Sequence, residues 1–263
     1  PCILLQLVAT GKPLSTAGMM IEDRTRTFII AMERTVVPEN FSFRMTDEEY
    51  RVLEKIKNSI PVCYLADHAD FALGIVTGNN KKFLSAEKTE HSEMVLKGTD
   101  ICKYHINPAK QYLRFEPEQF QQVAPLEIYR APEKLLYRFI SNQLVVAYDD
   151  RQMLSLNSCN IVIPKIEGMQ IKYILAILNS SVSQFVYQKE FHSIKVLRAH
   201  MEHIPIPRVG KAIQNEIIAM TEPLICGMGK EAAETCQKRL DCRIMDLFRL
   251  SAEEQWIIRH ALH

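Results

Sequence analysis

The chain has 263 residues, of which 47% are hydrophobic and 24% charged, values typical of a globular protein with a sizeable core. Its 32 lysines and arginines nearly balance 31 aspartates and glutamates, so the net charge of +1 neither demands nor excludes a nucleic acid partner. The longest apolar stretches are much shorter than the roughly 20 residues of a membrane-spanning helix, and no secretory signal opens the chain. We therefore expect no membrane partner.

The seven cysteines are odd in number and scattered, and none forms a C-x-x-C pair. This pattern predicts reduced thiols in a cytoplasmic protein rather than a disulfide framework or a zinc knuckle. Because the sequence begins at Pro1 and not at a methionine, we also expect it to be a piece of a longer chain.

The first 60 residues predict a connector with one strand and one helix. The run from Thr27 to Val37 is β-branched and apolar, which favours a strand. Thr46 and Glu49 form a capping box, and Val52, Leu53 and Ile56 supply an apolar stripe, so a helix should begin near Thr46 and end before Pro61.

Residues 61–210 alternate short apolar runs with turns, which predicts a mixed or antiparallel sheet. Asp149-Asp150 is expected to be a hairpin turn between two of these runs. One helix should follow Gly168 and pack on the sheet, bending at Asn179-Ser180-Ser181. The expected strands are 71–76, 93–96, 111–115, 144–148, 153–156 and 159–163.

From residue 211 onward the pattern is helical only. Pro205 and Pro207 predict an extended linker before it. Two apolar stripes are separated by Gly227 and Gly229, and Ser251 with Glu254 forms a second capping box. We therefore divide the chain into a connector (1–60), a central α/β domain (61–210) and a C-terminal helical segment (211–263).

The sequence lacks the motifs of the common enzyme sites. Neither glycine-rich phosphate loop occurs, and neither does the Asn-Pro-Pro-aromatic motif of adenine methyltransferases. His200 and His203 could share a helical face and bind a metal, and Cys102 with His105 is a looser pair, but neither pair has a third ligand in register. We therefore predict no catalytic set and no metal site in this chain.

The polar loop from Thr77 to Lys82 has two interpretations. It could be a glycine-bearing turn with a solvated, charged tip. Alternatively, Asn79 and Asn80 could contact adenine edges while Lys81 and Lys82 contact phosphates or guanine. Lys134 and Arg138 are four residues apart and could offer two positive charges on one side of a helix or a strand.

Six blocks of sequence, taken in order, resemble the TaqI-like C-terminal specificity domain, the target recognition domain of restriction–modification methyltransferases. The resemblance covers roughly Ser59 to Pro207 and extends weakly to the carboxyl terminus. The blocks are Leu65-Ala66-Asp67 with Gly74 and Thr77-Gly78-Asn79, then 96–101, 131–136, 156–158, 173–180 and 204–207.

The resemblance implies a mixed α/β domain that recognises double-stranded DNA and performs no chemistry itself. It also implies that this chain is a carboxyl-terminal piece of a type II restriction–modification protein, in which a separate adenine-N6 methyltransferase domain of the same polypeptide would use S-adenosylmethionine. A fused endonuclease, which would add Mg²⁺, is left open. The implied location is the bacterial cytoplasm. The DNA contacts that we expect are Thr77, Asn79, Asn80, Lys81, Lys82, Lys97, Lys103, Lys134 and Arg138.

Some of the resembling residues have expected folding roles. Gly74, Gly78 and Gly98 should free the backbone at turns, and the Asn157 side chain should bond to local backbone. Two other classes of function stay open. One is an interaction module that docks through the terminal helices, and the other is a metal-dependent hydrolase built on His200 and His203.

Overall fold

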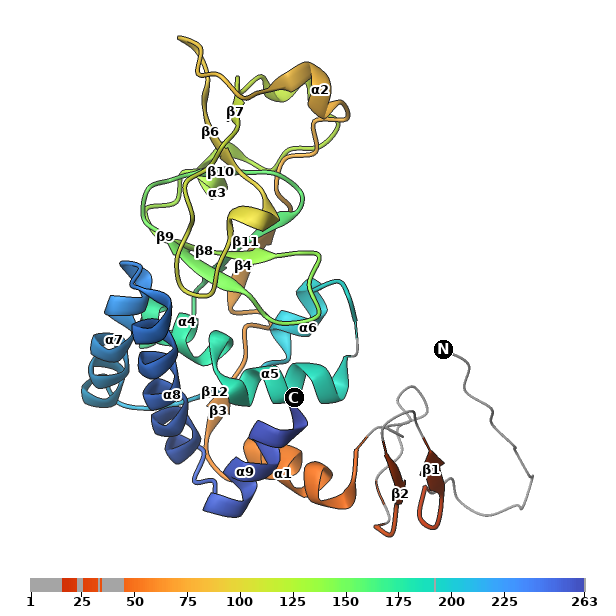
Figure 1. Cartoon of the computed structure of the whole chain (residues 1–263). Coiled ribbons are helices and arrows are strands. Elements are labelled where there is room, and N and C mark those ends of the chain that lie inside the picture. The colour runs from red at the N-terminus through yellow and green to blue at the C-terminus, as the bar shows by residue number, and fades with distance from the viewer. Residues whose placement is uncertain (1–15, 23–25, 33, 35–44, 192, 263) are drawn as a thin grey trace. The chain divides into compact units, whose positions relative to one another are not determined.

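The computed structural model describes residues 16–22, 26–32, 34, 45–191 and 193–262 (Figure 1). The chain divides into two compact units, residues 1–51 and residues 52–263. Helix α1 (Asp47–Asn58) begins in the first unit and continues into the second.

The first unit contains one antiparallel pair of short strands, β1 (Met20–Glu22) and β2 (Thr27–Ile29). Strand β2 covers only the first three residues of the strand expected over 27–37. Residues 30–32 and 34 are not in a strand, and residues 33 and 35–37 lie outside the described residues. Buried Arg34 forms an ion pair of 2.8 Å with Asp47, whose other carboxylate oxygen accepts the Ala31 and Met32 N–H groups. Asp47 thus joins the segment after β2 to the start of α1.

Helix α1 begins with the predicted capping box. The Glu49 N–H donates to Thr46 Oγ1 over 3.2 Å, and the Thr46 N–H donates to Glu49 Oε2 over 3.0 Å. Both bonds satisfy donors that the first helical turn leaves without a partner. Val52, Leu53 and Ile56 are buried, so the predicted apolar stripe is confirmed.

Two four-stranded sheets form the β part of the second unit. The larger sheet is antiparallel, in the order β4 (Ala69–Ala72), β11 (Cys159–Pro164), β8 (Lys134–Arg138) and β9 (Val146–Asp149). The smaller has the order β10 (Leu154–Ser155), β6 (Glu93–Leu96), β7 (Tyr112–Leu113) and β5 (Leu84–Ser85), with β10 and β6 parallel. Short helices α2 (Asn80–Phe83) and α3 (Leu126–Tyr129) accompany them. The expected mixed α/β fold is confirmed.

The hairpin predicted at Asp149-Asp150 is wrong. Strand β9 pairs with β8 of the larger sheet, whereas β10 pairs with β6 of the smaller one, so the turn between them carries the chain from one sheet to the other. The sequence resembles a hairpin turn because Asp149-Asp150 stands between two apolar runs. Only long-range pairing distinguishes the two kinds of turn.

The helix expected after Gly168 is two helices, α4 (Ile171–Asn179) and α5 (Ser181–Glu190). Ser180 is extended, with ψ 158°, and its side chain caps α5 by accepting the Ser183 N–H. The predicted bend is therefore a complete break. The Asn179 amide bonds to both backbone groups of Val146, and the Gln184 amide does the same at Leu144. These bonds satisfy backbone groups of Val146 on the edge strand β9 and of Leu144 just before it.

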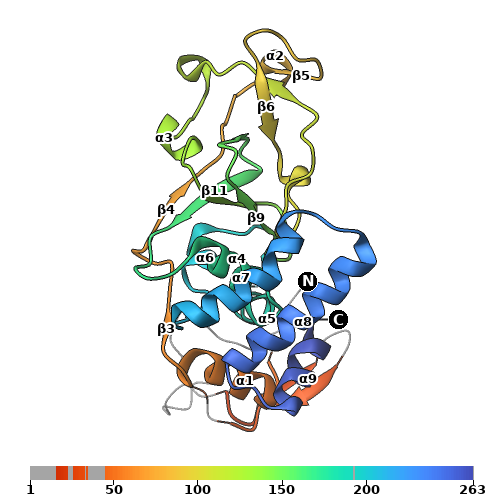
Figure 2. The same cartoon turned by 90° about the vertical axis from the view of Figure 1, so that its left-hand side faces the viewer.

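Helices cover the side of the larger sheet that faces away from the smaller one. Buried α4 packs between β9 and α7 (Lys211–Ile225), and α7 runs beside α8 (Lys230–Leu247), as Figure 2 shows. Two further helices are α6 (Arg198–Glu202) and α9 (Ala252–Ala261), and α9 begins with the predicted capping box at Ser251 and Glu254.

The expected extended linker is strand β12 (Ile206–Pro207), which pairs with β3 (Val62–Cys63). None of the described helices is both long and apolar enough to span a membrane.

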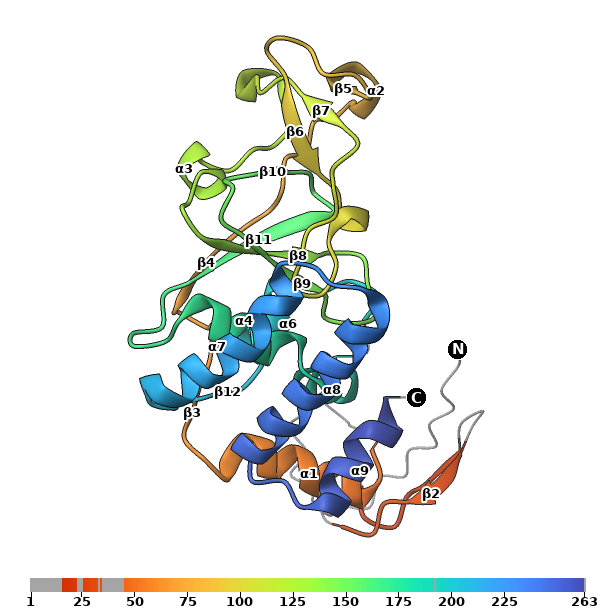
Figure 3. The same cartoon turned by 60° about the vertical axis from the view of Figure 1, so that its left-hand side comes forward.

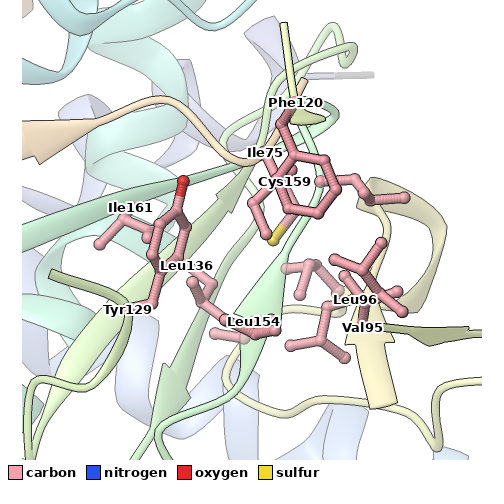
Figure 4. Close-up of a cluster of buried hydrophobic side chains, with 13 residues drawn as sticks. Ile75, Val95, Leu96, Phe120, Tyr129, Leu136, Leu154, Cys159 and Ile161 are labelled. Atoms are coloured by element: carbon pink, nitrogen blue, oxygen red, sulfur yellow. The ribbon is translucent and has the colours of Figure 1, made fainter. Parts of the chain in front are cut away.

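A buried cluster joins the two sheets (Figure 4). The larger sheet contributes Leu136, Cys159 and Ile161, and the smaller contributes Val95 and Leu96, among others. Phe120 and Tyr129 fill the space between the strands. Because side chains from both sheets share one core, the loops and turns at their edges are held in a common frame.

Two glycines have a role different from the expected one. At Gly74 a Cβ atom would lie 2.1 Å from the Leu156 carbonyl oxygen, and at Gly98 it would lie 2.4 Å from that of Ser158. Close backbone approach therefore requires these glycines, whereas Gly78, at φ +75°, is a true left-handed turn residue. In the neighbouring block, the side chain of Ser158, rather than the expected Asn157, bonds to the backbone, accepting the Gly98 N–H.

Candidate nucleic-acid interface

The loop Thr77–Lys82 is a compact turn that leads into α2. Asn79 caps this helix by accepting the Lys82 N–H through its side chain, and the Thr77 hydroxyl donates to Asn80 Oδ1 over 2.6 Å. Thr77 itself is buried. Each Asn Oδ1 atom already accepts one bond within the loop, so a two-bond contact with adenine would have to use the second lone pair of that oxygen.

Lys81 and Lys82 are exposed on α2, as the solvated-tip interpretation predicts. The Lys82 ammonium lies 3.2 Å from Gln119 Oε1 and 4.6 Å from the centre of the Phe83 ring. These contacts are weak and solvated, so both ammonium groups can reach an external phosphate.

Lys97 and Arg138 meet at the short 3₁₀ turn Gly98–Asp100. Arg138 donates to the carbonyl oxygens of Gly98 and Ile101, at 2.9 and 2.5 Å. The Lys97 N–H donates to the Asp100 carboxylate over 2.8 Å. Arg138 therefore clamps this turn to β8, and the side chain of Lys97, the residue before the turn, is half-buried.

Lys103 lies on the helical side of the second unit. Its ammonium donates to the Asn179 carbonyl oxygen over 3.1 Å, and burial lowers its pKa while the nearby Asp241 carboxylate opposes that change. Together with Tyr104 it lines a cleft of about 360 Å³ bordered by α7 and α8. By these contacts Lys103 lies against the helices, whereas Lys81 and Lys82 of the loop Thr77–Lys82 are exposed on α2.

The Asp241 carboxylate near Lys103 predicts a pH dependence of stability. Burial raises its pKa, while the Ser181 N–H and Gln237 oppose the rise. The Asp241 carboxyl group therefore binds its proton more tightly in the folded state than in the unfolded state. The stabilising contribution of this group is present at low pH and is lost as the pH rises through the pKa of the folded state. In urea titrations from about pH 3 to about pH 7, Asp241→Asn should gain stability relative to wild type as pH rises. A gain that shrinks with pH would contradict the shift.

Lys134 was expected to contact DNA, and its position in the structure shows that this prediction is wrong. Its side chain is 0% exposed, and its ammonium lies 2.6 Å from the equally buried Asp149 carboxylate and donates to the Tyr129 carbonyl oxygen. Burial lowers the pKa of Lys134, and the hydrogen bond with Asp149 opposes that fall. A lysine enclosed in this way cannot contact a phosphate, so Lys134 belongs to the core.

A groove of about 290 Å³ lies between the smaller sheet and the turn that follows β9. Its lining includes Lys88, Met94, Tyr112, Arg130, Arg151 and Gln152. Figure 3 shows the bordering elements β6, β7, β10 and α3 gathered at one end of the second unit. These residues were not predicted from the sequence, in which the only signal for them was the Asp149-Asp150 turn beside Arg151.

The two histidine positions have structural contacts. His200 is buried, stacks on Phe191 with a centroid distance of 4.6 Å, and accepts the Leu197 N–H through Nδ1. The His203 ring contacts the Ala199 carbonyl oxygen. Within the described part of the chain, no group of three or more His, Cys, Asp or Glu side chains is arranged to hold a metal ion.

The fold is of the mixed α/β class, and a comparison with known families finds a similar domain. Residues 93–206 match the model of the TaqI-like C-terminal specificity domain. The matched segment of the chain is therefore similar to that specificity domain. The groove residues Arg130, Arg151 and Gln152 lie inside the match, whereas the loop Thr77–Lys82 precedes it.

Several solved structures are similar to the chain. One comes from a type I restriction–modification system (13% identity, 82% of this chain and 52% of that chain, TM-score 0.43). Another is the type IIL enzyme MmeI in complex with DNA, with 11% identity over 76% of this chain and 35% of that chain and a TM-score of 0.49. A third is the HsdS subunit from Thermoanaerobacter tengcongensis, with 14% identity over 82% of this chain and 50% of that chain and a TM-score of 0.40. The chain thus spans about half of these chains or less. No curated protein matches it.

Proposed function

We propose that this chain recognises a DNA sequence on behalf of a restriction–modification enzyme, as the carboxyl-terminal part of an adenine-N6 DNA methyltransferase. The match of residues 93–206 to a specificity domain carries the proposal. Exposed Lys81 and Lys82, and the basic groove beside Arg151, supply the positive charge that binding to a phosphate backbone requires.

The partner in this proposal is a methyltransferase domain of the same polypeptide. That domain would use S-adenosylmethionine, and an additional endonuclease domain would require Mg²⁺. Such an enzyme acts on bacterial DNA in the cytoplasm. The present chain would contribute recognition and positioning, and its partner would contribute the chemistry.

In the proposed mechanism, lysines and arginines contact phosphates and set the register of the duplex. Side chains at base edges then select the sequence in the major groove, where each base pair presents a distinct pattern of donors and acceptors. With the duplex held in register, the partner domain can flip the target adenine out of the stack.

Replacing Lys81 and Lys82 by alanine should weaken binding to every duplex without changing sequence preference. Each phosphate contact that is lost should reduce the slope of log affinity against log salt by about 1. Filter-binding titrations at several salt concentrations would measure this slope.

Lys211→Ala and Lys230→Ala provide the control, because both lysines are exposed and begin helices α7 and α8. An unchanged slope in the Lys81 and Lys82 variant would remove these residues from the interface. A tight dimer that ignores duplex DNA would instead favour an interaction module, for which the exposed Trp256 of α9 is the supporting observation.

A further inference from the structure

The turn after β9 is held rigidly by a buried carboxylate. Asp149 accepts the Arg151 N–H and the Met153 N–H, both over 2.9 Å, while its charge is paired with Lys134 in the core. Between these two anchored residues, Gln152 has φ +56°, a left-handed conformation that is uncommon outside glycine. The turn therefore presents two polar side chains from a fixed and locally strained backbone.

Arg130 ties this turn to the smaller sheet. Its guanidinium donates to the Gln152 carbonyl oxygen over 2.7 Å and to Glu93 on β6 over 2.5 Å. The charge of Arg130 is thus matched by Glu93. Among the described residues, Arg151 and Lys88 have no carboxylate partner, so the groove keeps two uncompensated positive charges.

We propose that this groove reads base pairs in the major groove of DNA, with Arg151 and Gln152 as its specificity-determining residues. The inference rests on the proposed function and names the place where that function selects a sequence. A planar Arg fork matches the O6 and N7 atoms of guanine, and a Gln amide matches the N6 and N7 atoms of adenine.

The other side chains of the groove fit the same partner. Lys88 can contact a phosphate beside the bases that are read, as positioning contacts do. Met94 is 42% exposed and lies opposite Tyr112 across the β6–β7 pair, so the floor offers an apolar surface to a thymine methyl group. The carboxylates of an acidic peptide would pair with the two charges, but they would not contact the apolar floor or require the Gln152 amide.

Selection of binding sequences from a duplex pool with a randomised stretch tests the proposal, using the whole 263-residue chain. Wild type should yield a preferred sequence. Arg151→Ala should lose discrimination at one base pair of it, by about 5- to 150-fold, while still binding an unrelated duplex. Gln152→Gly, which suits the left-handed backbone, should lose discrimination at a neighbouring pair.

Two controls separate base reading from other roles. Arg239→Ala removes an exposed arginine of α8 and should leave the preferred sequence unchanged. Arg151→Lys keeps the charge but not the planar fork, so it should retain general affinity and lose part of the discrimination. Thermal melting of each variant would show whether the exposed substitutions leave the fold intact.

The possible results separate a failure of the proposed function from a failure of the groove as the site that reads the sequence. If wild type selects no sequence, the proposed function fails and the inference fails with it. If wild type selects a sequence that Arg151→Ala and Gln152→Gly leave unchanged, the groove is not the reader, while DNA recognition stands. A loss of affinity that is equal for all duplexes would make Arg151 a phosphate contact and overturn base reading.

Discussion

Replacing Lys134 by methionine should lower the free energy of unfolding by about 3–5 kcal/mol, because it leaves a buried carboxylate without its counter-charge. Both Lys134 and Asp149 are 0% exposed, and their charged groups are 2.6 Å apart. Removing both charges from such a pair is often tolerated, whereas removing one is strongly destabilising. Urea denaturation would measure the loss.

The double variant Lys134→Met with Asp149→Asn is the matched control for this effect. Asparagine at 149 carries no charge and keeps one of the two oxygens that accept the Arg151 and Met153 N–H groups, so one of these two bonds can persist. The double variant should therefore be more stable than Lys134→Met alone. If Lys134→Met alone lowered the free energy of unfolding by less than about 1 kcal/mol, Lys134 would be exposed at the surface. It would then be a candidate DNA contact again.

Gly74→Ala should destabilise the domain by about 3 kcal/mol, at the upper end of what overpacking usually costs. The added Cβ would lie 2.1 Å from the Leu156 carbonyl oxygen and 2.7 Å from that of Cys159, so one of two packed backbone segments must move. Because Leu156 and Cys159 belong to the core shared by the two sheets, the shift would also disturb the groove. Thermal and urea unfolding would measure the change.

Gly210→Ala is the comparison for this variant. No atom lies within 4 Å of a Cβ built at Gly210, and its φ of −68° is ordinary for any residue. As a helix N-cap, it should change stability by no more than about 1 kcal/mol. If Gly74→Ala were as stable as Gly210→Ala, the close approach of the two backbones would be wrong.

Features that depend on neighbouring residues were predictable. The capping boxes at Thr46 and Ser251 involve groups three residues apart, so they appear in the sequence as they do in the structure. Strand β6 was predicted with its observed limits, and β11 differs from the expected strand only at its end. The break at Ser180 follows from residues that favour helix caps.

Features that depend on distant residues were not predictable. Lysine is a residue type typical of the protein surface. Only the pairing of β9 with β8 places Asp149 beside Lys134 and buries both side chains. The turn at Asp149 resembles a hairpin until the pairing of β10 with β6 is known. The groove was missed for the same reason, because its lining comes from four separate segments between Lys88 and Met153.

The sequence by itself determined the mixed α/β class, the helical end of the chain, the local caps and the resemblance to a specificity domain, because periodicity and short motifs act over a few residues. Only the tertiary structure decided which charges face solvent. Burial depends on which strands pair, and pairing joins residues far apart in the chain. For that reason the tertiary structure moved Lys134 into the core and brought Arg151 and Gln152 to the edge of the groove.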